Sequence, residues 1–276
     1  MTEKEYRSHP AISRSELWRM HDSPEKFKWF KDHPEPATPA LLFGQVAHKM
    51  LLEPEDFDSE FVVAPNVDRR TKAGKAQWEE FQAEAADKTV VSQDFYQTAA
   101  EMREAVMRVP SAANLLSGNG ENERPFFWVD ELTGVECKCR TDRIIFNEDG
   151  GVTIVDYKTS ANAETGAFNS SIFKYGYNLQ AAMYSEGVMK ALCLTERPDF
   201  VFIVQEKKPP YSVNVVEVSE DVMTYGLDVF RELIGTYKEC MDVDFWPGYT
   251  GFYDEPNESY LPGYVTLGEE QEENDE

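Results

Sequence analysis

Two aspartates and a lysine are spaced so that a single β-hairpin brings them together. Asp149-Gly150-Gly151 is a strong turn signal, with β-branched residues after it. Asp142 and Asp156 each lie seven residues from the start of that turn, so a hairpin centred there pairs them across its strands. Because side chains alternate along a strand, Lys158 shares a face with Asp156, whereas Tyr157 points to the other face.

Paired carboxylates of this kind form a site for a hard metal ion. Directly opposed residues have Cβ atoms roughly 5 Å apart, and two like charges at that range destabilise the pair unless a cation lies between them. Mg²⁺ and Mn²⁺ prefer carboxylate and carbonyl oxygens, so we expect Asp142, Asp156 and the backbone carbonyl of Tyr157 as ligands. Lys158 then orients or deprotonates a water molecule, or stabilises charge on a phosphate. A hairpin with solvated charges is the alternative interpretation, because an isolated D-x-K motif is short and common.

Predicted helices supply further candidate residues. His48 lies in the apolar helix predicted over 40–52. Gln180 and Tyr184 are four residues apart, so they share one face of the helix predicted over 175–194. Each of these residues is weak evidence by itself, since a lone histidine or a tyrosine on a helix face more often belongs to the packing.

The surrounding sequence predicts the elements that hold these residues. Helices are predicted over 12–20 with a serine cap, from Ser23-Pro24 onward, over 40–52, in two polar segments between 75 and 109, over 175–194 and over 222–241. Strands are predicted on both sides of the turn 130–134 within 123–146, and over 152–160, 200–205 and 212–218. This order of elements indicates one central sheet flanked by helices.

The candidate residues occur in an order that resembles the RecB-type branch of the PD-(D/E)XK nucleases. The shared pattern is Gly44-x-x-x-His48, Asp142, Asp156-Tyr157-Lys158 and Gln180-x-x-x-Tyr184. Further segments, between about residues 10 and 240, resemble the nuclease domain of the RecE-type phage recombination exonucleases, also called the exonuclease VIII type. These segments are Ile12-Ser13-x-Ser15, Ser23-Pro24, Trp128, Thr133-Gly134, Cys137-Lys138-Cys139-Arg140-Thr141-Asp142, Asp156-Tyr157-Lys158-Thr159-Ser160 and Tyr175-Gly176-Tyr177-Asn178-Leu179-Gln180.

The resemblance implies a role for each candidate residue. Lys158 is the implied catalytic lysine, acting with Asp142 and Asp156. Gln180 and Tyr184 are implied to position the DNA strand. Glu123 is a candidate additional acid. The implied metal ligands are His48, Asp142, Asp156 and the backbone carbonyl of Tyr157.

The resemblance also implies a fold and an activity. The fold is the α/β restriction-endonuclease-like core, a central mixed sheet flanked by helices. The activity is that of an exodeoxyribonuclease dependent on Mg²⁺, or on Mn²⁺, which degrades linear double-stranded DNA from its ends, 5′ to 3′. One or two such ions polarise the scissile phosphate and lower the pKa of a bound water. The implied partners are double-stranded DNA ends, a RecT-type single-strand annealing protein in recombination, and further copies of the chain in a ring.

The cysteines argue against a further cofactor. Some RecB-type relatives hold an iron–sulfur cluster with one upstream cysteine and three near the C-terminus. Here Cys137 and Cys139 fall within the predicted sheet and only Cys240 is late, so we expect no iron–sulfur cluster. A single residue separates Cys137 from Cys139, which excludes a C-x-x-C redox pair. We expect these three and Cys193 to be buried, reduced thiols.

The net charge is the main evidence against a nucleic-acid enzyme. The chain of 276 residues carries a formal charge of -24, whereas DNA binding depends largely on neutralisation of phosphate by Lys and Arg. Six acids lie in 269–276, and we expect a single nuclease domain over 1–267 followed by a disordered acidic tail over 268–276. Even without the tail the chain is strongly acidic. Binding of DNA therefore requires a confined basic groove and bound metal ions.

Two alternatives and a compartment complete the expectations. No apolar stretch is long enough to span a bilayer, and Met1-Thr2-Glu3-Lys4-Glu5 lacks the apolar core of a signal peptide, so we expect a cytoplasmic protein without a membrane partner. One alternative function is another PD-(D/E)XK DNA nuclease, such as an endonuclease or a CRISPR-adaptation nuclease. The other is a non-catalytic DNA mimic or interaction protein, which the acidic charge suits.

Overall fold

A mixed β-sheet forms the centre of the protein. The computed structural model describes residues 1, 3–34, 36, 38–85 and 87–260. The strand order is β1-β5-β6-β7-β8, and β4 pairs with β5. The strands are β1 (Ile12–Ser13), β4 (Gly120–Val129), β5 (Glu136–Phe146), β6 (Val152–Ser160), β7 (Asp199–Glu206) and β8 (Val213–Glu217). The β1/β5 and β6/β7 pairs are parallel and the other pairs antiparallel, which confirms the predicted α/β fold with a central mixed sheet.

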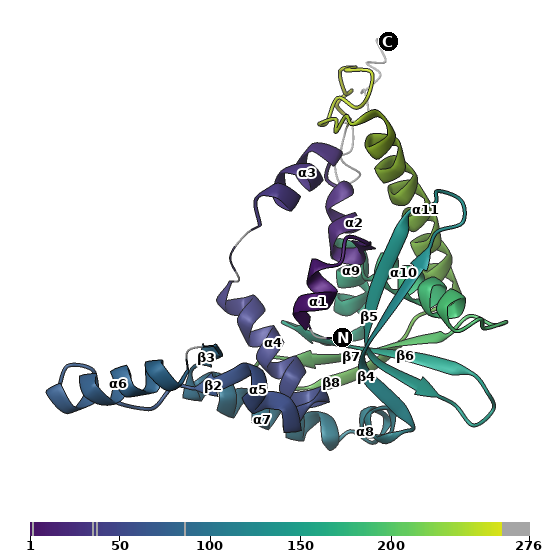
Figure 1. Cartoon of the computed structure of the whole chain (residues 1–276). Helices are drawn as coiled ribbons and strands as arrows, with labels where there is room; N and C mark the ends of the chain where they lie inside the picture. Colours follow the sequence, from purple (N-terminus) through teal and green to yellow (C-terminus); the bar gives the residue numbers. More distant parts are fainter. Residues whose placement is uncertain (2, 35, 37, 86, 261–276) are drawn as a thin grey trace, which may run out of the picture.

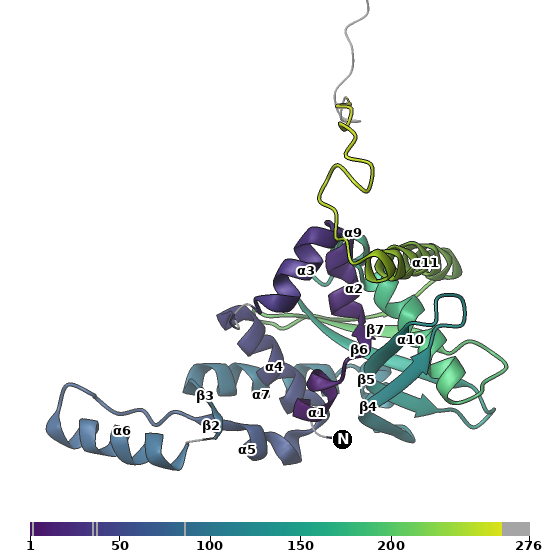
Figure 2. The same ribbon diagram turned by 45° about the horizontal axis from the view of Figure 1, so that its top comes forward.

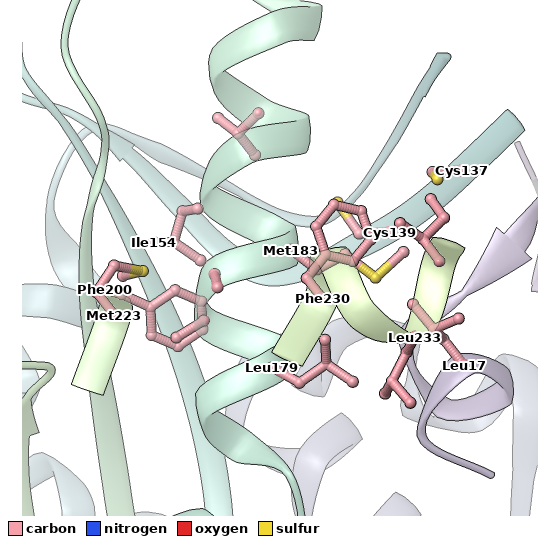
Figure 3. Close-up of a cluster of buried hydrophobic side chains, with 14 of the residues drawn as sticks. Leu17, Cys137, Cys139, Ile154, Leu179, Met183, Phe200, Met223, Phe230 and Leu233 are labelled. Carbon is pink, nitrogen blue, oxygen red and sulfur yellow. The ribbon is translucent and has the colours of Figure 1, made fainter. Parts of the chain in front are cut away.

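Helices cover both faces of this sheet (Figures 1 and 2). On one face lie α2 (Arg14–Met20), α3 (Pro24–Asp32), α9 (Thr165–Lys174), α10 (Tyr177–Ala191) and α11 (Glu220–Val243). On the other lie α4 (Pro39–Leu52), α7 (Gln93–Met107) and α8 (Pro110–Ser117). Because side chains alternate along a strand, neighbouring residues of β6 enter different cores. The buried apolar residues between the sheet and α10 and α11 form what we call the first cluster, which includes Ile154 and is shown in Figure 3. Those between the sheet and α4 and α7 form the second cluster, which includes Val155.

Local capping explains where the helices begin. Ser13 forms a capping box with Glu16 at the start of α2, and Thr38 caps α4, whose first residue is Pro39. All the predicted helices and strands are present. The sequence did not predict β1, whose residues were assigned to the helix over 12–20. It also did not predict α1 (Glu3–Ser8), the 3₁₀ turn Pro54–Asp56, α5 (Phe57–Glu60), α8, α9 or the short parallel pair β2 (Phe61–Val63) and β3 (Thr89–Val91). The first of the two polar helices is α6 (Lys72–Glu84), which extends away from the sheet (Figures 1 and 2).

The hairpin of β5 and β6 has the predicted register. Arg143 pairs with Val155 and Phe146 with Val152, so the turn is centred on Asp149. The same register sets Asp142 opposite Asp156, but the paired residues of these strands end at Arg143. Beyond this point β5 pairs with β1. The two strands therefore separate where the aspartates begin, and we call this opening the fork.

Other expectations have mixed outcomes. The predicted acidic tail, residues 268–276, lies outside the described residues. Cys137, Cys139 and Cys240 are buried as predicted. The prediction for Cys193 was wrong, because it lies in the turn after α10, where its side chain is exposed. No helix in the described part of the chain is both long and apolar enough to cross a membrane.

Candidate active site

The fork is closed by a side chain in place of a strand partner. The backbone N–H of Tyr157 donates a hydrogen bond of 2.8 Å to Asp142 Oδ2. The carboxylate of Asp142 thus satisfies a donor that the adjacent strand leaves unpaired. That hydrogen bond holds Asp142 against β6 near Asp156, whose pKa is raised by burial and, in addition, by the charge of Asp142.

A third acid, Glu123, lies on the other side of Asp142. The register of β4 and β5 pairs Asn122 with Arg143 and Arg124 with Thr141, which leaves Glu123 opposite Asp142 without a bridge between them. Glu123 has a φ of 51°, a left-handed conformation that costs a non-glycine residue about 1–2 kcal/mol.

The backbone of β5 also reverses its alternation at this point. Cys139 and Ile144 both contact the first cluster although they are five residues apart. In a regular strand, residues separated by an odd number face opposite sides. The alternation therefore changes between Cys139 and Ile144, and Asp142 lies within that stretch.

His48 joins the two acids of β4 and β5 into a trio. Its Nε2 lies 2.8 Å from Asp142 Oδ2, and its Nδ1 lies 3.2 Å from Glu123 Oε1. Helix α4 holds His48 in place because the adjacent Val46 and Ala47 are buried in the second cluster. One ligand atom from each member of the trio lies within 4.8 Å of the others. One imidazole and two carboxylates make a donor set for a divalent cation.

Asp156 lies outside this trio and faces two residues of its own. The carboxylate is 1% exposed, and Lys158 Nζ lies 2.5 Å from its Oδ2. Gln180, on α10, donates a hydrogen bond from Nε2 to Asp156 Oδ1. The structure therefore brings the predicted residues together in two adjacent groups. One is the trio of His48, Glu123 and Asp142, and the other is Asp156 with Lys158 and Gln180.

The site has the features of a place for a cation. Within the described part of the chain, Glu123 Oε1 and Asp156 Oδ2 are buried carboxylate oxygens without a hydrogen bond of ordinary geometry. Their nearest partners are His48 and Lys158. Buried oxygens of this kind are costly unless a donor or a metal ion satisfies them. The residues present thus fit a divalent metal ion held by His48, Glu123 and Asp142 beside Asp156.

The pKa values show the same crowding of negative charge. Burial, together with the charge of Asp142, raises the pKa of Asp156 to about 6. Burial raises the pKa of Glu123 to about 8. Burial opposes the charged form of His48, but the carboxylates of Asp142, Glu123 and Asp156 outweigh it and raise the pKa of His48 to about 9. Burial also opposes ionisation of Asp142, but His48 and Lys158 hold its pKa below the ordinary range.

The remaining predicted residues lie close to this centre. Tyr184 is on α10, one turn beyond Gln180, where it packs against the first cluster and burial raises its pKa. The side chain of Tyr157 points away from the fork, as predicted, and its hydroxyl donates to Gln205 Oε1 at 2.6 Å. Tyr157 can therefore take part in the site only through its backbone N–H and carbonyl groups.

Two arginines that the sequence analysis did not assign complete the surroundings. Arg140 Nε lies 2.8 Å from Glu123 Oε2. Arg14 donates to the carbonyls of Tyr175 and Gly176, and its guanidinium lies 5.7 Å from the ring centre of Tyr177. Both occur in the segments that carry the family resemblance, and Arg140 is two residues before Asp142 on the same strand. This short spacing from Asp142 could have identified Arg140 as a site residue from the sequence.

Comparison with solved structures finds a protein of similar fold. The crystal structure of a protein named "Putative exonuclease", from Eubacterium rectale, matches with a TM-score of 0.60 and 13% identity, over 95% of this chain and 96% of that chain. The crystal structure of SSO0001 matches with a TM-score of 0.32 and 15% identity, over 71% and 86%. None of the curated proteins compared with the sequence matches it.

The comparison with family models gives the assignment. PD-(D/E)XK nucleases use divalent metals, in agreement with the donor set at the fork. Residues 13–255 match the model of a PDDEXK-like domain of unknown function, DUF3799. Because this match spans most of the chain, the protein belongs to the PDDEXK-like family DUF3799.

Proposed function

We propose that the protein is a metal-dependent DNA exonuclease that degrades linear double-stranded DNA from its ends. The observation that carries this proposal is the fork, where Asp142, Asp156 and Lys158 converge beside the donor set of the trio.

Each residue of the site has a distinct task in this proposal. His48, Glu123 and Asp142 hold Mg²⁺, or Mn²⁺, and Asp156 is a further ligand. The bound ion supplies Lewis acidity for the scissile phosphate and lowers the pKa of a water. The nearby aspartates raise the pKa of Lys158 although burial opposes its charge, so Lys158 remains protonated. This favours stabilisation of phosphate charge, rather than deprotonation of water, as the task of Lys158.

The finer assignment rests on the resemblance to RecE-type exonucleases. It supports 5′ to 3′ digestion for single-strand-annealing recombination, with a RecT-type annealing protein as partner. The structural neighbour from Eubacterium rectale is named "Putative exonuclease", which is consistent with attack at DNA ends. We further propose a homo-oligomeric ring, because a chain with a net charge of -24 holds one duplex more firmly when several basic strips surround it.

Linear and closed circular duplex DNA distinguish these functions. Incubation with Mg²⁺ should shorten an end-labelled linear duplex and leave a closed circle intact, and removal of the metal with EDTA should abolish digestion. Nicking or opening of the circle would indicate an endonuclease. Binding to DNA-binding proteins without cleavage of either substrate would favour the DNA mimic that the acidic charge suits. Separate 5′ and 3′ labels report polarity, and light scattering reports the ring.

A further inference from the structure

The densest group of basic residues in the chain lies outside the candidate site. Residues 61–91 form an arm composed of β2, the loop 64–71, α6 and β3. Figures 1 and 2 show α6 projecting away from the sheet and the helices that cover it. Only four positions separate the end of α6 from β3, which pairs with β2. The C-terminal end of α6 is therefore at the base of the arm, and its N-terminal end is at the tip, about 20 Å away.

The tip concentrates positive charge in an acidic protein. Seven consecutive positions, 69–75, hold four of the 27 Lys and Arg residues, and all four are exposed. Among the residues that the structure describes, none of the four has a carboxylate partner in a salt bridge. These residues, which we call the basic tip, are Arg69, Arg70, Lys72 and Lys75. Their charge is thus available to an outside partner.

The tip is a built structure with a defined backbone. Thr71 Oγ1 accepts a hydrogen bond from the N–H of Gly74 and donates one to the carbonyl of Asp68, both at 3.0 Å. Asp68 Oδ1 accepts from the N–H of Arg70 at 2.9 Å. A Cβ on Gly74 would lie 2.0 Å from the carbonyl oxygen of Asp68, so only glycine allows the loop to approach α6 this closely. The cations are therefore presented from a fixed loop and helix start.

The chemistry of the arm favours an anionic partner over an apolar one. The large apolar side chains of α6, Trp78 and Phe81, pack on each other with ring centres 5.2 Å apart. The guanidinium of Arg69 covers the Trp78 ring at 3.6 Å. The other exposed positions described on α6 are alanine or polar, and the three acids in its sequence, Glu79, Glu80 and Glu84, come in its second half, toward the base. The tip thus offers charge without an apolar patch, which suits a phosphate backbone.

We infer that the basic tip binds the phosphate backbone of duplex DNA beyond the part held at the fork. This inference rests on the proposed DNA nuclease function and adds a second contact to it. Duplex DNA carries one negative charge per about 1.7 Å of its axis, so an arm about 20 Å long can reach phosphates well away from the reacting one. The contact provides affinity without sequence preference, and it places the needed positive charge away from the acidic body of the protein.

Binding of a labelled 40-base-pair duplex tests the inference. Fluorescence anisotropy is measured with Mg²⁺ in a Lys158→Ala background, so that DNA is bound without being cut. Arg70→Ala/Lys72→Ala should lower the affinity at least about tenfold near 0.1 M salt and make the slope of log K against log salt shallower by about 1 to 2. The matched control, Lys28→Ala/Lys238→Ala, removes two charges, from exposed Lys28 of α3 and half-buried Lys238 of α11, and should stay within about twofold of its parent. Arg70→Lys/Lys72→Arg keeps the charges and should keep the affinity.

The outcomes separate the tip from the proposed function. A tip variant that binds like the control, while the protein with Lys158 intact digests linear duplex, overturns the inference and leaves the function standing. If no form of the protein binds or digests duplex DNA, the proposed function fails and the inference fails with it. A tip variant with a changed molar mass in light scattering but normal DNA affinity would make the tip a contact between copies and would also overturn the inference. Thermal unfolding confirms that each variant is folded.

Discussion

Glu123 lies opposite Asp142 across β4 and β5, and the two residues share the ring of His48 instead of a backbone bridge. The left-handed backbone at Glu123, with a φ of 51°, accompanies the reversal of alternation in β5. The strained backbone is thus found at one of the three residues that form the candidate metal site. A strained residue at a candidate active site is a hypothesis of function, since a fold tolerates such a residue only when the surroundings hold it in place.

Replacement of Glu123 by two small residues measures this strain. Glu123→Gly and Glu123→Ala both remove the carboxylate, but only glycine adopts a φ of 51° without steric cost. We expect the glycine variant to be more stable than the alanine variant by about 1 kcal/mol. Urea unfolding of the two metal-free proteins provides the measurement. Equal stability, or a more stable alanine variant, would show that the backbone at this position is unstrained.

Asp142→Ala, Asp156→Ala and Lys158→Ala should each abolish cleavage of linear duplex, with losses of at least about a thousandfold. The two aspartate variants should also bind Mg²⁺ more weakly, whereas Lys158→Ala should retain binding because an ammonium is not a metal ligand. Gel assays with end-labelled DNA and calorimetric titration of Mg²⁺ separate the two effects. Near-normal cleavage by any of the three variants contradicts the assignment of the fork as the active site.

Tyr157→Phe provides a matched comparison between neighbours on β6. The Tyr157 hydroxyl donates to Gln205 Oε1 in the core on the far side of the sheet from Lys158. Its loss leaves a buried acceptor unsatisfied, at a cost of about 1–3 kcal/mol in the free energy of unfolding. The backbone carbonyl is unchanged, so the rate of cleavage at 25 °C should stay within a few-fold of wild type. A large loss of activity in a stable Tyr157→Phe protein would give the side chain a role in the site.

Regular periodicity made much of the site predictable from sequence. The turn at Asp149 fixed the register of the hairpin, and the two-residue period of β6 placed Asp156 and Lys158 on one face. The helical period likewise placed Gln180 and Tyr184 on one face of a helix, and in the structure Gln180 meets Asp156. These inferences need only local geometry, and they hold because each element is regular up to the fork.

The parts that could not be predicted depend on irregular backbone or long-range contact. Glutamate carries no signal for a positive φ, so the left-handed conformation of Glu123 and the reversal of β5 were invisible in the sequence. Arg14 reaches the turn before α10, which lies 161 residues later in the chain, and no periodicity relates residues so distant. The basic tip of the arm was readable as composition, but its position depends on how β2 pairs with β3.

The metal-free protein should lose stability as the pH rises. An acid whose pKa is raised on folding favours the folded state below its ordinary pKa, and that contribution is lost as the pH passes the raised value. This window runs from 3.8 to about 6 for Asp156 and from 4.5 to about 8 for Glu123. The raised pKa of His48 acts in the same direction, from 6.5 to about 9. Thermal unfolding in EDTA should therefore show a decreasing melting temperature between about pH 5 and pH 9.

Addition of Mg²⁺ should oppose this trend. Metal binding requires deprotonated carboxylates and a neutral imidazole, so the stabilisation by Mg²⁺ should grow as the pH rises over the same range. The increase in melting temperature on adding Mg²⁺ should be small at pH 5.5 and larger at pH 8.5. The control is Asp142→Asn, which should show little increase at either pH. An equal increase at both pH values in the wild-type protein would contradict a site made of these titrating ligands.

Gln180 offers a choice between two roles that kinetics can separate. The sequence resemblance implies contact with the DNA strand, whereas in the structure its side-chain amide donates to Asp156 Oδ1. A residue that orients a metal-binding carboxylate typically contributes 10- to 100-fold to metal affinity or activity, about the size we expect here. Gln180→Leu should then raise the Mg²⁺ concentration needed for half-maximal cleavage by about that factor, and excess Mg²⁺ should restore much of the rate.

The opposite result would assign Gln180 to the substrate. If Gln180 acts on the DNA strand, the Gln180→Leu variant should show a raised KM for DNA that excess Mg²⁺ does not correct. Tyr184→Phe is the matched comparison on the next turn of α10, because it changes one hydroxyl on the same helix face and leaves Asp156 with its amide partner. We expect Tyr184→Phe to keep the Mg²⁺ requirement of wild type. A Gln180→Leu protein with an unchanged requirement for Mg²⁺ and an unchanged KM would exclude both roles and reduce the hydrogen bond to packing.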